Sequence, residues 1–153
     1  MGLRRKAREL AIQTLYALDF SEIGEEFREF NLLNTYPEIL NQMAAHEKLT
    51  DENGAVIFAN DLIRNTILQL EDIEKMLEKH SNNWKIERIV SLDRCILRVA
   101  IYEMLHTTTP APIVINEAIE IAKKYSSEGS GKFVNGILDA VHQELEFTKK
   151  TEP

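Results

Sequence analysis

The sequence contains one cysteine, no long apolar run and no closely spaced histidines. The lone Cys95 excludes an intramolecular disulfide, and its apolar neighbours in DRCILRVAIY indicate a reduced, buried thiol. Because the longest apolar runs are only a few residues, we expect no secretion signal, no membrane span and a cytoplasmic protein. The four histidines are far apart in the sequence, which therefore predicts no metal site.

Catalytic patterns are also missing. Glu117 and Glu120 fall on one helix face, which is a common arrangement of solvated charges, and no nucleophile or oxyanion donor accompanies them. The single cysteine has no histidine at a defensible spacing. The sequence therefore predicts no enzymatic activity and no cofactor.

The stretch SSEGSGKFVNGILDAV, residues 126–141, is the segment most like a phosphate-binding loop. The nucleotide motif G-x-x-x-x-G-K-[ST] needs glycine in place of Ser126, a hydroxyl in place of Phe133, and a preceding strand. All three requirements fail. We instead predict a helix junction, in which Gly129 takes a left-handed conformation and Ser130 caps the last helix.

Helical periodicity runs through most of the chain, and no segment alternates with the period of two that is typical of strands. The predicted class is all-α, with about six or seven helices. A turn is expected at 50–54 and a break in the helix at 80–84. An extended connection is expected at 107–112, because the residues before Pro110 and Pro112 are disfavoured in the helical conformation. The expected helices span about 3–19, 25–33, 37–45, 55–80, 86 or 91 to 106, 113–125 and 131–145.

The first helix has one apolar stripe, and the long helix over 55–80 has another. The first stripe leaves Arg4, Arg5, Arg8 and Tyr16 mainly outside the buried face. The second predicts one continuous helix that acts as a structural spine. The stripe positions are Leu3, Ala7, Leu10, Ala11, Thr14, Leu15 and Leu18 in the first helix, and Val56, Ala59, Ile63, Ile67, Leu70, Ile73 and Leu77 in the second.

Charge is distributed unevenly along the chain. The net charge is −7, yet residues 1–8 hold Arg4, Arg5, Lys6 and Arg8 and no acid, so this basic tip carries +4. The other 145 residues hold 14 bases and 25 acids, or −11. Cations are mildly unfavourable at a helix N-terminus, so a purely structural role leaves the cluster unexplained. The basic tip predicts a phosphate-binding patch.

Three blocks of sequence point to a known family. They are RRKARELAIQTLYALDF (4–20), LDRCILRVAIYEML (92–105), and PIVINEAIEIAKKY with GKFVNGILDAV (112–141). Together they resemble the NusB family of bacterial transcription antitermination factors. The resemblance implies two small helical bundles packed across each other, a single all-α RNA-binding domain over 1–146, no enzymatic activity and no cofactor. The polar composition of residues 147–153 predicts a flexible tail.

The resemblance also implies a set of partners. The protein is expected to pair with the ribosomal small-subunit protein that doubles as NusE, and the pair to bind boxA, a single-stranded element of nascent RNA. That complex joins RNA polymerase with NusA and NusG to resist termination, notably in ribosomal RNA operons. The resemblance leaves open whether the chain alone is a monomer or a homodimer.

Site residues follow from the matching positions. Phe133 is either a stacking face or a core residue, and Asn135 either an RNA contact or a surface amide. Asp93 suits a basic partner, although an acid near a helix N-terminus is also favoured by the dipole. The expected RNA contacts are Arg4, Arg5, Lys6, Arg8, Gln13, Tyr16, Lys132, Phe133 and Asn135, and the expected NusE contacts are Tyr16 and Asp93.

Two departures from the family pattern affect these expectations. Gly129 and Gly131 stand where relatives often carry larger side chains, and residues 21–60 are longer and more acidic than in the compact family version. Two other functions stay open. One is an accessory domain like those attached to RNA cytosine methyltransferases, although no methyl-donor motif is present in this sequence. The other is a helical interaction module without RNA, which the basic tip disfavours.

Overall fold

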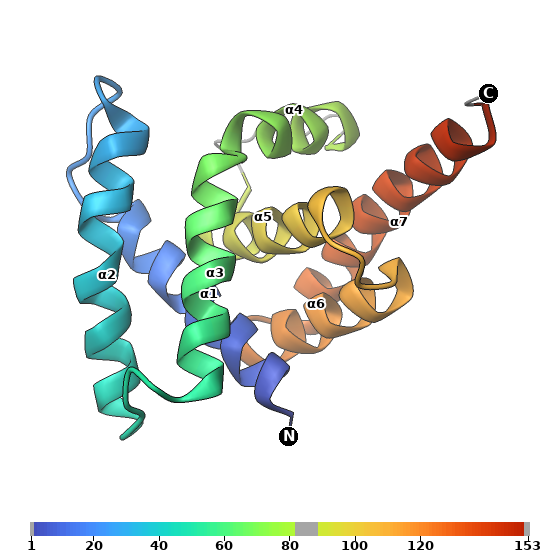
Figure 1. Cartoon of the computed structure of the whole chain (residues 1–153). Coiled ribbons are helices and arrows are strands. Elements are labelled where there is room, and N and C mark those ends of the chain that lie inside the picture. Colours follow the sequence, from blue (N-terminus) through green and yellow to red (C-terminus); the bar gives the residue numbers. More distant parts are fainter. Residues whose placement is uncertain (1, 82–88, 152–153) are drawn as a thin grey trace. The chain divides into compact units, whose positions relative to one another are not determined.

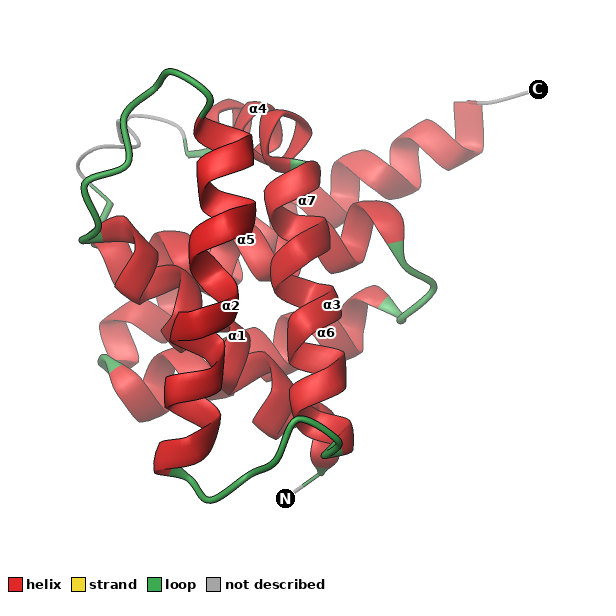
Figure 2. Cartoon of the chain, turned by 60° about the vertical axis from the view of Figure 1, so that its left-hand side comes forward, coloured by secondary structure: helices red, strands yellow, loops and turns green. Residues whose placement is uncertain are grey.

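The computed structural model describes residues 2–81 and 89–151, and these contain seven helices and no strand (Figures 1 and 2). The chain divides into two compact units, Met1–Leu70 and Glu71–Pro153. The predicted all-α class is confirmed. None of the helices in the described ranges is both long and apolar enough to span a bilayer. The helices are α1 (Leu3–Asp19), α2 (Arg28–His46), α3 (Gly54–Leu68), α4 (Leu70–His80), α5 (Ser91–His106), α6 (Ala111–Tyr125) and α7 (Glu128–Thr151).

The first unit is a three-helix bundle in which each helix packs against the other two. Helices α2 and α3 lie side by side and α1 crosses them (Figures 1 and 2). Leu10 of α1 and Ile63 of α3 are fully buried, and each such side chain contributes about 1.5–3 kcal/mol by leaving water. The Tyr36 hydroxyl donates to Oδ1 of Asn60 at 2.8 Å and joins α2 to α3.

Helix α1 has the predicted bounds, but its buried surface is wider than one stripe. Every residue from Ala7 to Ile12 is buried, so this part of the helix is enclosed on all sides. Arg8, predicted outside the buried face, is therefore inside it, with 4% of its surface exposed. Leu3, predicted inside, is exposed because it stands in the first turn, before the enclosed part begins.

Helix α2 corrects the prediction for residues 25–45. Instead of two short helices, one helix runs from Arg28 to His46 with Pro37 inside it. Proline lacks the N–H that would bond to the carbonyl of Leu33, and for that reason Pro37 was expected to begin a new helix. Tyr36 and Leu40 are buried on either side of it, so packing holds the helix together through the proline. The turn at 50–54 is confirmed, and Asn53 caps α3 by accepting the Ala55 N–H at 2.8 Å.

The predicted spine is two helices. Helix α3 ends at Leu68 and α4 begins at Leu70, with Gln69 outside helical geometry. The apolar spacing continues through this break without a glycine or proline, so the sequence carries no signal for it. Helix α3 packs in the core of the first unit and α4 belongs to the second, because the boundary between the units follows Leu70.

In the second unit α5, α6 and α7 pack against one another. Helix α5 begins at Ser91, one of the two predicted starts, whereas residue 86 and residues 82–84 of the predicted break lie outside the described residues. Helix α6 begins two residues earlier than predicted, at Ala111, because Pro112 occupies a first-turn position where the missing N–H would have no partner.

Helix α7 is longer than predicted at both ends. It begins at Glu128, and Ser127 rather than Ser130 is the cap, since its Oγ accepts the Ser130 N–H at 3.0 Å. Gly129 lies within the helix, and no glycine of the described residues has a positive φ. Residues 147–151, predicted as part of a loose tail, are helical, and residues 152–153 lie outside the described ranges.

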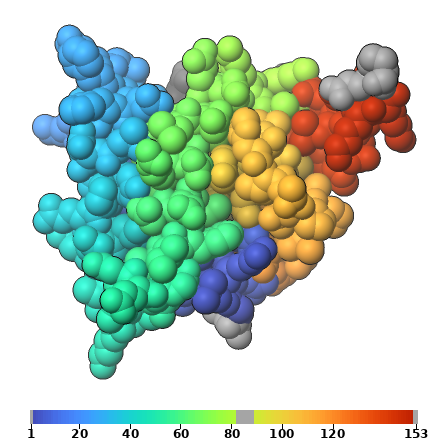
Figure 3. Space-filling model, in the orientation of Figure 1, coloured from blue at the N-terminus to red at the C-terminus, as the bar shows by residue number. Residues whose placement is uncertain are grey.

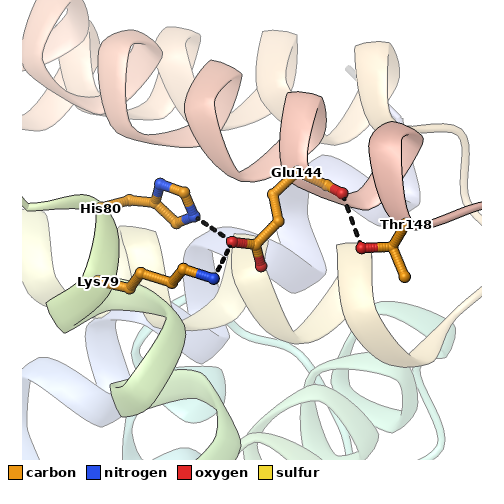
Figure 4. Close-up of polar contacts among 4 residues, drawn as sticks. All are labelled: Lys79, His80, Glu144 and Thr148. Atoms are coloured by element: carbon orange, nitrogen blue, oxygen red, sulfur yellow. Dashed lines mark hydrogen bonds and ion pairs between the residues drawn. The ribbon is translucent and has the colours of Figure 1, made fainter. Parts of the chain in front are cut away.

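Polar contacts attach α4 to the rest of its unit. Arg98 of α5 donates to Glu74 at 2.6 Å. At the end of α4, Lys79 and His80 both meet the Glu144 carboxylate of α7, with His80 Nε2 3.2 Å from Oε1 (Figure 4). The hydrogen bond from Lys79 is the main cause that lowers the pKa of Glu144. These contacts hold the middle and the C-terminal end of α4.

Candidate nucleic-acid interface

The N-terminus of α1 carries cations where the helix dipole opposes them. Arg4, Arg5 and Lys6 stand in the first turn, which holds no acid, and Gly2 provides no side-chain cap. Positive charge at a helix N-terminus costs a few tenths of a kcal/mol per group. By contrast, α4 carries Glu71 and Asp72 in its first turn, where the dipole favours them. The cluster on α1 is thus unfavourable for the helix itself and suits an external anion.

Arg4 is the most accessible member of the basic tip. Its side chain is exposed, and its guanidinium carbon lies 5.6 Å from the centre of the Phe58 ring. The N-terminal turn of α1 and the start of α3 are neighbours at the surface of this unit (Figure 3). Resting on the ring fixes the plane of the guanidinium, so its N–H edge can pair with a phosphate and its outer face can stack on a base.

The remaining members of the basic tip are less accessible. Lys6 is partly exposed, and its Nζ lies 3.1 Å from Glu47 and 3.8 Å from Glu9, so carboxylates already offset its charge. Arg5 is partly exposed and Arg8 is buried, and both interact with other residues of the protein. The structure therefore leaves less than the formal +4 for a ligand.

Gln13 and Tyr16 follow along α1. Gln13 is partly buried, whereas the Tyr16 ring is exposed and meets the Phe20 ring edge-on at 4.9 Å between centroids. Phe20 was not among the predicted residues. The spacing of four residues after Tyr16 is the signal that indicates this pairing.

The second unit contributes a groove of about 250 Å³ between α6 and α7. Lys132 and Asn135 are exposed along it, one turn apart, and Lys123 faces them from α6. Lys123 was not predicted, since nothing in its sequence context distinguishes it from a lysine at a helix end. Phe133 is half-buried, so both of its interpretations stay open. The groove is lined by Ile119, Lys123, Glu128, Gly131, Lys132 and Asn135.

Gly131 controls the depth of this groove. A Cβ atom at that position would lie 3.1 Å from Cγ of Lys123 and 3.7 Å from Cγ2 of Ile119. The 3.1 Å contact would require the Lys123 side chain to move by a few tenths of an ångström, whereas 3.7 Å is ordinary van der Waals contact. The glycine, predicted to shape a loop, instead permits close packing of two helices.

Asp93 is buried rather than presented to solvent, with 4% of its surface exposed. Its Oδ2 accepts the Ser130 hydroxyl at 3.1 Å, which connects the first turn of α5 to α7, while Oδ1 has no hydrogen-bond partner among the described residues. Burial raises the pKa of the Asp93 carboxyl, and the hydrogen bond from Ser130 opposes that rise. Asp93, which the resemblance predicts as a NusE contact, thus has its carboxylate enclosed within the second unit.

Replacing Asp93 by Asn is expected to leave the protein as stable as the wild type at pH 7, or more stable by on the order of 1 kcal/mol. A raised folded-state pKa contributes stability that is fully present below the unfolded value of about 3.9 and is lost as pH rises through the folded value. The advantage of D93N should therefore shrink as pH falls from 7 to 4. Urea denaturation of both proteins at several pH values measures this difference. A loss of stability in D93N that is the same at every pH would contradict the prediction.

The predicted residues are divided between the two units. The basic tip, Gln13 and Tyr16 belong to the first unit, whereas Asp93, Lys132, Phe133 and Asn135 belong to the second. Within the described ranges, no cluster of three or more His, Cys, Asp or Glu side chains is suited to a metal ion. Each unit thus presents cations together with polar or aromatic side chains, which is the chemistry of nucleic-acid binding.

Comparisons with known proteins agree with this chemistry. The NusB family profile matches residues 5–143. The transcription antitermination protein NusB of Thermodesulfovibrio yellowstonii is 41% identical over 142 residues, which cover 92% of each chain. NusB of Solibacter usitatus is 38% identical over 145 residues, which cover 95% of this chain and 92% of that protein.

A solved structure shows the same fold. The NusB chain in a crystal structure of the antitermination factors NusB and NusE with double-stranded RNA has a TM-score of 0.76 and 25% identity, covering 93% of this chain and 97% of that one. The NusB relatives are antitermination factors and not enzymes, so the non-enzymatic prediction is confirmed. The family match spans both units and almost the whole chain, and the chain belongs to the NusB family.

Proposed function

We propose that this chain, an antitermination factor of the NusB family, binds single-stranded boxA RNA together with a NusE partner. The observation that carries the proposal is the first turn of α1, where Arg4, Arg5 and Lys6 stand without an acid and against the helix dipole. Arginine suits this role because its planar guanidinium both pairs with phosphate and stacks on bases.

The α6–α7 groove supports a second set of RNA contacts. Lys132 supplies a cation, Asn135 supplies an amide that donates and accepts hydrogen bonds, and Lys123 lies across the groove. An amide can both donate to and accept from the edge of an unpaired base, whereas a lysine can only donate. We therefore assign a backbone contact to Lys132 and a base contact to Asn135. Lys123 lies 3.9 Å from Glu120, which already offsets part of its charge.

The partner assignment rests on the family. A solved relative is bound to NusE and RNA at the same time, so we extend the pairing with NusE to this chain. Tyr16 provides an exposed aromatic ring for such a contact. Asp93 is buried, so its part in partner binding would act through Ser130 and the first turn of α7.

The wider assembly follows from the same extension. We propose that the complex acts in the cytoplasm with RNA polymerase, NusA and NusG, and that ribosomal RNA operons are its main targets. RNA phosphates would bind the cationic first turn of α1, and the basic ribosomal protein would contact the aromatic ring of Tyr16. The chain would enter the complex either as a resting monomer or as a monomer that dissociates from a homodimer.

Titrating labelled boxA-like RNA at several salt concentrations, with and without NusE, tests the proposal. Four neutralised phosphates predict a slope of log affinity against log salt near −3 for single-stranded RNA. With Arg8 buried and Lys6 paired, we expect Arg4, Arg5 and Lys132 to carry the effect and the slope to be near −2.

Variants make this test specific. R4A/R5A is expected to reduce the magnitude of the slope by about 1.4, and K132A by about 0.7. The control is K149A/K150A, which removes two cations from the exposed last turn of α7 and should leave the slope within about 0.3 of the wild-type value. Equal slopes for R4A/R5A and the wild type would overturn the assignment of the basic tip.

A further inference from the structure

Three phenylalanines stand on the surface where α1 gives way to α2. Phe20, Phe27 and Phe30 have 68%, 73% and 67% of their surfaces exposed. Phe27 directly precedes α2 and Phe30 lies in its first turn, so both rings stand at the start of that helix. Single exposed apolar residues are ordinary, but three phenylalanine rings within eleven residues mark an interaction surface.

The backbone at Phe27 adds to this observation. Its φ of 53° and ψ of 34° are left-handed, a conformation that costs a bulky residue about 1–2 kcal/mol. Glycine or asparagine would remove most of that cost at the same position. Both the strained backbone and the exposed ring are unfavourable for the isolated chain, which indicates that the ring is kept for contact with another molecule.

The charge around these rings indicates what that molecule is. Residues 19–30 hold five acids and one base, Arg28, which gives this segment a charge of −4. Phosphates of RNA and anionic lipid headgroups would be repelled. Arginine and lysine side chains would be attracted, and apolar side chains among them would cover the rings. The acids are Asp19, Glu22, Glu25, Glu26 and Glu29.

A second copy of this chain fits the surface less well. The chain has a net charge of −7, so two copies repel each other, and Lys6 of the basic tip is already paired with Glu47. A separate protein segment that combines lysine or arginine with leucine-like side chains meets both requirements. Aromatic residues dominate binding energy at such interfaces, while charge sets the rate and the choice of partner.

We propose that residues 19–30 form a docking surface for a basic, amphipathic segment of another protein, with Phe20, Phe27 and Phe30 as its apolar contacts. The surface uses none of the residues assigned to RNA. It adds to the proposed function a second protein contact, made by the first unit, and it gives residues 21–30, which are acidic and depart from the family pattern, a specific role.

An 18-residue helical peptide of leucine and lysine, labelled with a fluorophore, is the probe. We expect saturable binding to the full chain and amide chemical-shift changes concentrated in residues 19–30. F27N/F30S should weaken binding at least tenfold, because asparagine keeps the left-handed backbone while both rings are lost. F27N alone should also raise the free energy of unfolding, a gain that a purely structural ring would not give.

Matched controls separate the apolar and ionic contributions. Phe147, 68% exposed on α7, provides the control variant F147S, which should bind the peptide as the wild type does. E25Q/E26Q/E29Q should slow association and reduce its dependence on salt. A leucine–glutamate peptide of the same pattern should not bind.

Four results would overturn the proposal. They are unchanged binding in F27N/F30S, chemical-shift changes outside residues 19–30, equal binding of the acidic peptide, and self-association of the wild type that F27N/F30S abolishes. The last result, seen by sedimentation, would assign the surface to a second copy of this chain. BoxA RNA affinity should not change in F27N/F30S, so the outcome is independent of the proposed RNA site.

Discussion

Replacing Arg8 by Ala is expected to lower the free energy of unfolding by about 3 kcal/mol, whereas R4A should change it by less than about 0.5 kcal/mol. The two arginines are one helical turn apart in the same basic tip, yet Arg4 is exposed and Arg8 is buried. Truncating Arg8 removes the interactions of a buried side chain and opens space beside the core of α1.

Urea denaturation of R8A, R4A and R8K measures this difference. R8K keeps the charge but loses the planar guanidinium, so we expect an intermediate loss. If R8A unfolds like the wild type and yet loses RNA affinity, Arg8 is a direct RNA contact and its burial has no structural role. The expected result means that Arg8 should be left intact in any RNA-binding test of the basic tip.

Replacing Glu74 by Ala is expected to cost about 3 kcal/mol of stability in the second unit. Glu74 of α4 accepts from the buried Arg98 of α5 at 2.6 Å, and Arg98 has little surface exposed to water. Removing the carboxylate leaves a buried guanidinium without its closest counter-charge, which is the costly way to break an ion pair. Partial exposure of Glu74 places the loss at the lower end of the range for buried pairs.

The chain offers a matched control on the same helix. Glu71 pairs with Lys75 at 3.3 Å, but both side chains are largely exposed, so E71A should cost less than about 0.5 kcal/mol. Replacing both partners, in E74L/R98M, should recover part of the loss because the buried guanidinium is removed together with its counter-charge. If E74A and E71A unfold at the same urea concentration, the Arg98 pair contributes no more than a surface pair.

The helices were predictable wherever local chemistry decides them. The spacing of apolar residues gave α1 its bounds, and the TDENG turn located the start of α3. Packing decided the other cases. Pro37 stays inside α2 because buried side chains flank it, and the chain breaks at Gln69 although its apolar pattern continues. A single sequence does not show which neighbours an apolar residue will meet.

The candidate site was predictable in its chemistry and less so in its geometry. The basic tip and Lys132 were identified from charge and from the family resemblance. Burial of Arg8 and Asp93 was not, because a charged residue is normally exposed and only the surrounding helices enclose these two. The cap at Ser127 was missed since Ser126, Ser127 and Ser130 are all suitable residue types and only the backbone distinguishes them.

The single buried thiol allows opening of the second unit to be measured by chemical modification. Cys95 is fully enclosed within α5, so a thiol reagent can modify it only when the second unit opens. The modification rate therefore measures the opening free energy of that unit in the absence of denaturant. E74A should accelerate labelling by about two orders of magnitude, because a stability loss of about 3 kcal/mol shifts the opening equilibrium by about that factor. Labelling of R8A would then show whether loss of the first unit also opens the second.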